Sequence, residues 1–375
     1  MTAKSDILIA GGYGMVGRKM AANLAHDYPN QVVIAGRNVE TASRVASELG
    51  HGVRARHIDV RDRDSVDRAM RGIGTIVSCV AQPETPHLLL ASVSQGCGYT
   101  DIAPMALKRP AYPDALKAEA VDSGARIILG AGLVPGISNV FARMGADREG
   151  TVDSIESACL LSLGDEYGSD SKGFVAEEIV TAFKATINGE NVLARPFTGP
   201  KGIEFAPPLG VFTAYLFPFS DQVYYPVTLG ARTAVSRLAL LPQWLPRVLA
   251  VLLPLIGSAL KKRRRGPDGP LSGLMDSLKS KYKGVDWWGV QVEMLGPNGV
   301  YKARVQGHGQ ASATALSAAA FVRALVEGEV DRPGIWTADQ VVPVGPFLAR
   351  LAAHELVPTI NVSERADHPS RRYAA

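Results

Sequence analysis

The segment from Ile7 to Gly17 constrains the fold of this chain more than any other feature. It consists of a short apolar run, a glycine-rich turn and the start of a pattern with helical period. Its glycines fit both G-x-G-x-x-G and G-x-x-G-x-x-G, spacings that permit a tight turn, close approach of a pyrophosphate and close packing of the helix on the strand. Because the turn lies between a strand and an amphipathic helix, it predicts a dinucleotide at the helix N-terminus. The predicted contacts are Gly11, Gly12, Tyr13, Gly14, Met15, Val16 and Gly17.

The same alternation of apolar runs and helical segments continues to about residue 131. Short strands that alternate with helices are typical of a parallel sheet with crossover connections. Since such crossovers are right-handed, the pattern predicts a Rossmann-type, doubly wound α/β sheet with its ligand crevice at the carboxyl ends of the strands. The predicted strands are 7–10, 32–35, 53–58, 75–80 and 127–129, and the predicted helices are 15–25, 39–49, 63–70, 84–95 and 108–121.

The second predicted strand ends in Gly36, Arg37 and Asn38. Enzymes that use NAD usually carry Asp or Glu at this position, which binds the ribose 2′-hydroxyl. Gly36 lacks that carboxylate, whereas Arg37 offers a planar cation suited to a 2′-phosphate, although it could also be an ordinary exposed arginine. The sequence therefore favours NADP(H), with these three residues among the cofactor contacts.

The third strand ends near Asp59 and Val60, two further candidate cofactor contacts. The Asp59 carboxylate could accept a hydrogen bond from the adenine amino group. It could equally cap the helix that starts near Asp62. The sequence leaves both roles open.

The fourth strand ends in Cys79, Val80 and Ala81. Backbone and small side chains at this position would flank the nicotinamide ribose. We interpret Cys79 as a small buried residue rather than a nucleophile, because no neighbour in sequence would activate its thiol.

The composition is that of a soluble globular protein, with 46% hydrophobic and 20% charged residues, and 375 residues are enough for two domains. A net charge of +4 is too weak and dispersed to predict a nucleic-acid partner. Cys79, Cys97 and Cys159 have no metal-ligand spacing, and their odd number argues against a disulfide framework. We therefore predict no metal and a cytoplasmic setting, without a signal peptide.

After Pro135 and Gly136 the pattern changes. Longer β-like runs at 154–163, 290–295 and 301–305 mix with helical segments at 174–187 and 313–325, which predicts an α+β domain with a mainly antiparallel sheet. Pro135 follows the last strand of the first domain, where the chain must cross the cofactor crevice, so it is also a candidate cofactor contact.

The apolar stretch at 238–260 contains an arginine and three prolines and precedes a basic run at 261–265. Its length is near that of a membrane span, but the prolines and the arginine argue against a transmembrane helix. It could lie on a membrane surface, anchored by the basic run on anionic lipid. We favour a cover over an apolar substrate channel or a dimer interface.

Several of these motifs resemble the saccharopine dehydrogenase-like family of NADP-binding oxidoreductases. The matching segments are 11–17, 35–37, 98–101, 132–139 and the helical segment 311–325 with the Gly and Pro residues that follow it. The resemblance covers most of the first domain and the end of the chain, and it is weak between them. It implies a Rossmann domain at 1–135, an inserted α+β domain at 136–330 that shapes the substrate site and forms a homodimer, and a segment at 331–375 that returns to the Rossmann domain.

The resemblance also implies hydride transfer to or from a C–N bond, although related branches of the family act on lipid-like substrates. Reduction of an imine requires protein groups that orient the acceptor at the nicotinamide and keep its nitrogen protonated. Tyr99, Asp101 and Asn139 are the candidate catalytic residues. Alternatively, Tyr99 and Asp101 are turn residues and Asn139 is a helix-start residue.

The sequence has no Tyr-x-x-x-Lys pair in a suitable place, which argues against carbonyl reduction through a tyrosine acid. We predict an NADPH-dependent reductase of a C=N bond in a small metabolite. Two alternatives stay open: an ene or carbonyl reductase for a hydrophobic, lipid- or polyprenyl-like substrate, and a catalytically silent NADP-binding regulator.

Overall fold

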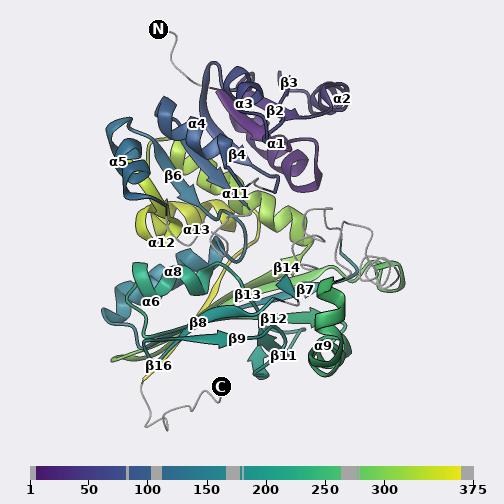
Figure 1. Ribbon diagram of the computed structural model, residues 1–375, viewed down its shortest axis with the longest axis vertical. Helices are drawn as coiled ribbons and strands as arrows, with labels where there is room; N and C mark the ends of the chain where they lie inside the picture. Colours follow the sequence, from purple (N-terminus) through teal and green to yellow (C-terminus); the bar gives the residue numbers. More distant parts are fainter. Residues whose placement is uncertain are drawn as a thin grey trace. The chain divides into compact units, whose positions relative to one another are not determined.

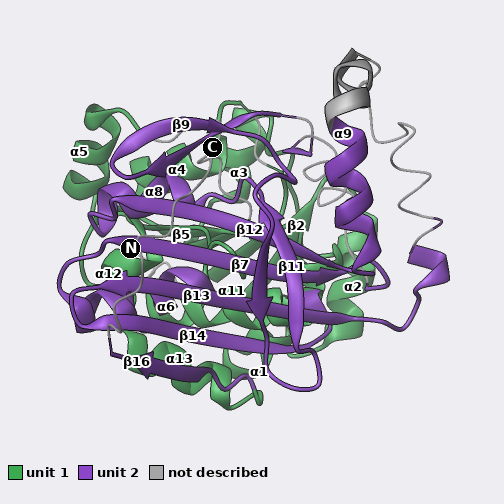
Figure 2. Cartoon of the chain, turned by 90° about the horizontal axis from the view of Figure 1, so that it is seen from below, with its two compact units in different colours: residues 1–136, 311–355 green, residues 137–310, 356–375 purple. Residues whose placement is uncertain are grey.

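The computed structural model describes residues 6–81, 84–102, 112–165, 178–179, 181–262, 277 and 279–364, with the backbone alone at 254–262. The chain divides into two compact units (Figure 2). Unit 1 consists of Met1–Gly136 and Ala311–Glu355, and unit 2 consists of Ile137–Gln310 and Leu356–Ala375. Each unit is built around its own β-sheet.

Unit 1 contains a seven-stranded parallel sheet (Figure 1). The order reverses between β1 and β4, which is the kind of switch point where doubly wound sheets bind their ligands. The predicted Rossmann-type fold is confirmed. In sheet order the strands are β15 (Gly334–Thr337), β6 (Arg126–Leu129), β5 (Gly98–Asp101), β4 (Ile73–Ser78), β1 (Asp6–Ala10), β2 (Val32–Gly36) and β3 (Arg54–His57).

Strand β5, like β15, is not among the strands that we predicted from apolar runs. Its sequence, Gly-Tyr-Thr-Asp, has no apolar pattern, yet all four residues are buried. It pairs with β4 on one side and β6 on the other. A central strand of a parallel sheet is buried by its neighbours and by the helices that cover it, so tertiary packing determined this strand.

The helices of unit 1 follow the sequence pattern with shifted ends. Helix α2 (Val39–Leu49) has the predicted bounds, and Asn38 Oδ1 caps it by accepting from the Thr41 amide at 2.8 Å. Residues 108–111 of the last predicted helix lie outside the described residues. The others are α1 (Met15–Asp27), α3 (Arg63–Ala69), α4 (His87–Gln95), α5 (Asp114–Asp122), α11 (Gln310–Val326), α12 (Ala338–Val341) and α13 (Val344–Ala352).

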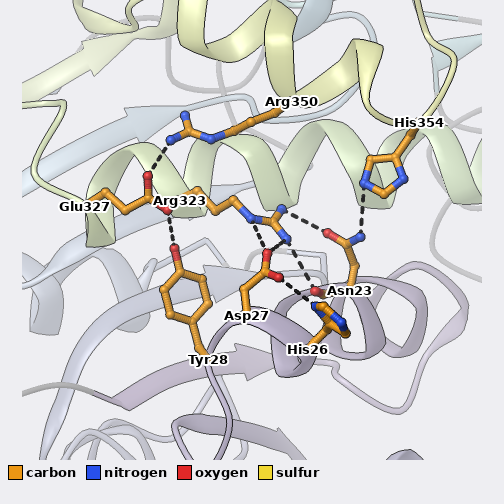
Figure 3. A network of polar contacts seen from close by, with 8 residues as sticks. All are labelled: Asn23, His26, Asp27, Tyr28, Arg323, Glu327, Arg350 and His354. Carbon is orange, nitrogen blue, oxygen red and sulfur yellow. Dashed lines mark hydrogen bonds and ion pairs between the residues drawn. The ribbon is translucent and has the colours of Figure 1, made fainter.

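Polar contacts join the C-terminal part of unit 1 to α1 (Figure 3). Arg323 of α11 donates through Nε to Asp27 Oδ2 at 2.9 Å and through Nη1 to Asn23 Oδ1 at 2.9 Å. Tyr28 Oη donates to Glu327 Oε1 at 2.6 Å, and Glu327 Oε2 accepts from Arg350 at 2.6 Å. Helix α11 is thereby part of unit 1.

The boundaries near the C-terminus differ from those we predicted. The chain returns to unit 1 at Ala311, not at residue 331, because α11 already packs there. The segment 331–375 does not return as a whole, since β15 pairs with β6 of unit 1 while β16 (Thr359–Ser363) pairs with β14 of unit 2. The periodicity of α11 predicted a helix but could not show which sheet it covers.

Unit 2 contains a nine-stranded mixed sheet. The pairing of β12 with β7 is parallel, and the other pairings are antiparallel, in agreement with the predicted α+β unit. The main path runs through β10 (Lys201–Glu204), β11 (Val211–Leu216), β12 (Thr233–Leu241), β7 (Ser154–Ser162), β13 (Trp287–Gly296), β14 (Gly299–His308) and β16, while β8 (Phe183–Ile187) pairs with β12 and with β9 (Glu190–Ala194). Its helices include α6 (Ile137–Glu149), α8 (Asp221–Thr228) and α9 (Trp244–Lys262).

One sequence prediction in unit 2 is wrong. The helix predicted at 174–187 is strand β8 at its C-terminal end, where Phe183 and Ala185 are buried on either side of exposed Lys184; residues 174–177 lie outside the described residues. The apolar stretch 238–260 is the end of β12 followed by α9, with Pro242 between them. Alternation of period two explains why 183–187 forms a strand, and Pro242 separates β12 from α9. The predicted role of 238–260 as a cover over a substrate channel or a dimer interface stays a prediction.

Candidate functional site

The glycine-rich turn between β1 and α1 has room for backbone only. Gly11 has a φ of +80°, and a Cβ there would lie 2.6 Å from Val80 Cγ1. A Cβ at Gly17 would lie 2.3 Å from the Gly11 carbonyl oxygen. Gly14 is the N-cap residue of α1 and supplies no side-chain cap, so the first turn can donate its amides to an anion. The turn fits a pyrophosphate group.

The side chain of Tyr13 packs over Gly36 at the end of β2. A Cβ at Gly36 would lie 2.3 Å from Tyr13 Cε1, so the phenol ring occupies the space that any side chain at position 36 would need. Tyr13 Oη also accepts a hydrogen bond from the Asn38 amide at 3.3 Å. An acidic side chain at position 36, of the kind that binds a ribose 2′-hydroxyl, would therefore require the Tyr13 ring to move.

Arg37 follows Gly36 directly and is exposed. Within the described part of the chain its guanidinium forms no ion pair, although its charge contributes to lowering the pKa of Asp59. A planar cation in this position can bind a phosphate in bidentate fashion. Position, exposure and charge all fit a 2′-phosphate.

Asp59 lies after β3, and Arg61 already binds its carboxylate. Arg61 Nε donates to Asp59 Oδ1 at 3.1 Å and Arg61 Nη2 donates to Oδ2 at 2.9 Å. These hydrogen bonds lower the pKa of Asp59 to about 2. Asp62, not Asp59, caps α3, since Asp62 Oδ1 accepts from the Asp64 amide at 3.0 Å. An adenine amino group would have to share the Asp59 carboxylate with Arg61.

Cys79 follows β4, with its backbone against the glycine turn. Its amide donates to the Ala10 carbonyl at 2.8 Å, and its carbonyl oxygen would lie 3.1 Å from a Cβ at Gly11. Burial, followed by the charge of Asp101, raises the pKa of the Cys79 thiol to about 12. The thiol is therefore protonated at neutral pH, which favours a packing role over a nucleophilic one.

Most of the predicted cofactor contacts follow the carboxyl ends of strands in the unit 1 sheet. Met15, Val16, Val60 and Val80 are half-buried, and Ala81 is exposed. They follow β1, β3 and β4, whose carboxyl ends share one edge of a parallel sheet. Pro135 is buried in the loop that leads out of unit 1.

Tyr99 and Asp101 form a buried hydrogen-bonded pair on β5. Tyr99 Oη donates to Asp101 Oδ2 at 3.2 Å, and Asp101 Oδ1 accepts from the Gly130 amide at 2.9 Å. Tyr99 is fully buried and Asp101 is 2% exposed. Burial raises the pKa of Asp101 to about 6, while the hydrogen bonds from Gly130 and Tyr99 lower it. Burial and then Asp101 raise the pKa of Tyr99 well above its ordinary value.

The loop after β6 packs tightly on α11. A Cβ at Gly136 would lie 2.0 Å from the Gly132 carbonyl oxygen, and that oxygen accepts from Ser317 Oγ of α11 at 2.8 Å. Ser317 is fully buried. Residues more than 180 positions apart in sequence thus fix the loop.

Sequence reasoning missed three groups: the Gly130 amide, Ser317 and Ser78. Ser78 is fully buried at the end of β4, and its hydroxyl contributes to lowering the pKa of Tyr99. Its position at the end of a predicted strand was a usable signal. The Gly130 amide and Ser317 had no such signal, because their partners, Asp101 and Gly132, are distant in sequence.

Asn139 is fully buried in α6 of unit 2. It belongs to a different unit from Tyr99 and Asp101. The predicted catalytic residues therefore include one buried pair and one residue of the other unit.

Residues 7–128 match the family model of the saccharopine dehydrogenase NADP binding domain. A solved structure, apo saccharopine dehydrogenase (L-Glu forming) from Saccharomyces cerevisiae, is similar with 16% identity and a TM-score of 0.68, covering 96% of this chain and 100% of the yeast chain. The sequence itself matches no curated protein.

Two other solved structures are similar at lower TM-scores. GenD2 from gentamicin A biosynthesis, in complex with NAD, has 15% identity and a TM-score of 0.43, and 96% of each chain is covered. A myo-inositol dehydrogenase from Corynebacterium glutamicum has 14% identity and a TM-score of 0.41, covering 95% of this chain and 98% of that one. Similarity at this level carries no information on function.

The glycine turn, the switch point and the exposed cation after β2 define a dinucleotide-binding protein of the Rossmann type. Residues 7–128 carry a domain of the saccharopine dehydrogenase NADP-binding type, and the fold of the chain is similar to that of the yeast saccharopine dehydrogenase. These findings support an oxidoreductase with a nicotinamide dinucleotide cofactor.

Proposed function

We propose that this protein is an NADPH-dependent oxidoreductase that transfers hydride between the cofactor and a C=N bond of a small metabolite. The observation that carries the NADP part is the Tyr13 ring over Gly36, with Arg37 exposed beside it. The acid that would favour NAD is absent at position 36, where the Tyr13 ring lies instead, while a guanidinium is available for a 2′-phosphate.

In this proposal the glycine turn binds the pyrophosphate through backbone amides, and Arg37 binds the 2′-phosphate. The nicotinamide, when bound, supplies or accepts the hydride. The carboxyl ends of β4 and β5 lie beside the switch point, so Cys79 to Ala81 would flank the nicotinamide ribose.

Tyr99 and Asp101 act in this proposal as positioning residues. Both are buried, and together with the Gly130 amide they link the carboxyl ends of β5 and β6. Such a link fixes the loop that carries Gly132 and Pro135 at the edge where the ligand binds. Asn139 is fully buried in α6 of unit 2, and its predicted catalytic role stays a prediction.

Titration of NADPH and NADH against the wild type and Arg37→Ala tests the cofactor assignment. We expect Arg37→Ala to weaken NADPH binding by roughly tenfold to a hundredfold, as for loss of a charge-assisted bond, and to leave NADH binding nearly unchanged. Arg63→Ala is the matched control, because Arg63 is an exposed arginine of α3 that pairs with Asp67 and is not among the predicted cofactor contacts. Equal losses for both cofactors would refute the 2′-phosphate assignment.

Oxidation of NADPH by fractionated metabolite pools tests the bond type. Turnover with amine- and carbonyl-containing pools that form imines supports the proposal. Turnover with lipid extracts alone would instead favour an ene or carbonyl reductase for a hydrophobic substrate. Tight NADPH binding without turnover in any pool would favour a silent regulator.

A further inference from the structure

Helix α9 of unit 2 has apolar residues on two faces. Leu245 and Leu253 are 7% and 8% exposed, and the helix packs against β12. A second set is open to solvent: Trp244, Val248, Val251 and Leu252, with exposed fractions of 43%, 40%, 67% and 42%. Their spacing places them on one stripe of the helix. Within the described residues, each side chain of this stripe stays at least 40% exposed to solvent.

Positive charge is concentrated around the same helix. Residues 244–283 contain nine of the 40 Lys and Arg residues of the chain and only two of its 36 Asp and Glu residues. This segment alone exceeds the net charge of +4 of the whole chain, so the remainder is net negative. The basic character of the protein is local to this region.

The structure places cations near the first turn of α9, and the sequence supplies more at its end. Trp244 Nε1 donates to Tyr282 Oη at 2.9 Å, which holds the exposed Lys281 and Lys283 near the first turn. The last helical residues are Lys261 and Lys262, and the sequence continues into three arginines. In Figures 1 and 2 the helix lies at the periphery of the unit 2 sheet.

We propose that α9 docks unit 2 on an anionic lipid surface. The stripe would enter the boundary between headgroups and acyl chains, with Trp244 at the interface, and the lysines would bind lipid phosphates. None of the helices in the described ranges is long and apolar enough to cross a membrane. The helix would therefore lie in the plane of the surface.

Charge favours lipid over a second copy of this chain. In a two-fold symmetric interface the same patch meets itself, so two strongly positive regions would face each other. Anionic headgroups instead neutralise the lysines at both ends of the helix, and each cation adds to surface binding.

Co-sedimentation with vesicles tests the proposal on the full-length protein. Vesicles of phosphatidylcholine with about one third phosphatidylglycerol should bind the wild type, and vesicles of phosphatidylcholine alone should bind it at least tenfold less. The double variant Val251→Asp/Leu252→Asp should lower partitioning on anionic vesicles by roughly tenfold or more. Lys281→Gln/Lys283→Gln should lower it by about fivefold per charge and reduce its salt dependence.

Leu193→Asp is the matched control, because Leu193 of β9 is 74% exposed and lies outside α9. It should bind vesicles as the wild type does, and all variants should bind NADPH unchanged, which separates this result from the cofactor assignment. Absence of wild-type binding to anionic vesicles overturns the proposal. The proposal is also overturned if Val251→Asp/Leu252→Asp binds anionic vesicles as well as the wild type does. A third overturning result is a wild-type dimer that this double variant dissociates while vesicle binding stays the same.

Discussion

The Tyr13 ring lies over Gly36, so that a Cβ at position 36 would approach Tyr13 Cε1 to 2.3 Å. The two residues are 23 positions apart, one in the glycine turn and one at the end of β2. Position 36 therefore carries no carboxylate, and the Tyr13 ring lies where a side chain at this position would begin.

Gly36→Asp should weaken the binding of both NADPH and NADH by about tenfold or more, because the new side chain displaces the Tyr13 ring at a cost of about 1–3 kcal/mol. The double variant Tyr13→Ala/Gly36→Asp has room for the carboxylate and should bind NADH better than NADPH. Fluorescence titration of both cofactors measures this. Tyr13→Ala alone is the control, and an unchanged preference in the double variant would show that the ring does not set it.

Gly17→Ala should destabilise unit 1 by about 1–3 kcal/mol, because its Cβ would meet the backbone of Gly11 at 2.3 Å and cannot be relieved by a side-chain rotation. Gly345→Ala in α13 is the matched control, since its Cβ meets nothing within 4 Å. That substitution should be neutral or stabilising by up to about 1 kcal/mol. Thermal unfolding compares them, and equal midpoints for both variants would contradict the packing account.

Asp101 should make stability depend on pH. Its pKa is about 6 when folded, above the ordinary value of 3.8, so the folded state binds a proton more tightly than the unfolded state. This stabilisation is fully present below pH 4 and is lost as the pH rises towards and past 6. The loss is about 3 kcal/mol at most.

Asp101→Asn cannot ionise and can keep the contacts with Gly130 and Tyr99. The unfolding free energy of this variant minus that of the wild type should therefore increase between about pH 4 and pH 6.5 and stay level above that. Denaturant unfolding across this range measures the difference. Parallel pH profiles for the two proteins would mean that Asp101 does not titrate there.

Arg323→Ala should loosen α11 from α1. Arg323 has a side chain that is 11% exposed and donates to both Asp27 and Asn23, so we expect a loss of about 1–3 kcal/mol. Arg18→Ala removes an ion pair with Glu48 in which both side chains are at least 40% exposed, and should cost about 0–1 kcal/mol. Amide hydrogen exchange in α11 should increase for Arg323→Ala and not for Arg18→Ala. Equal exchange in the two variants would mean that the Arg323 contacts drawn in Figure 3 do not hold α11 on α1.

The sequence predicted the elements whose periodicity and turn chemistry are local. The glycine turn, α2 with its Asn38 cap and the apolar strands of unit 1 follow from short segments. By contrast, β5 has no apolar pattern, and β8 was mistaken for the end of a helix. The formation of β5 and β8 depends on pairing with the strands beside them, which a local sequence pattern does not show.

The sequence by itself determined a dinucleotide-binding Rossmann unit and the cation at Arg37, because a tight turn and a strand end require particular residues in a fixed order. The tertiary structure decided that Tyr13 fills the space above Gly36, that Asp101 is buried against Gly130, and that α11 belongs to unit 1. Each of these depends on contacts between residues far apart in the chain, and sequence spacing carries no information about such contacts.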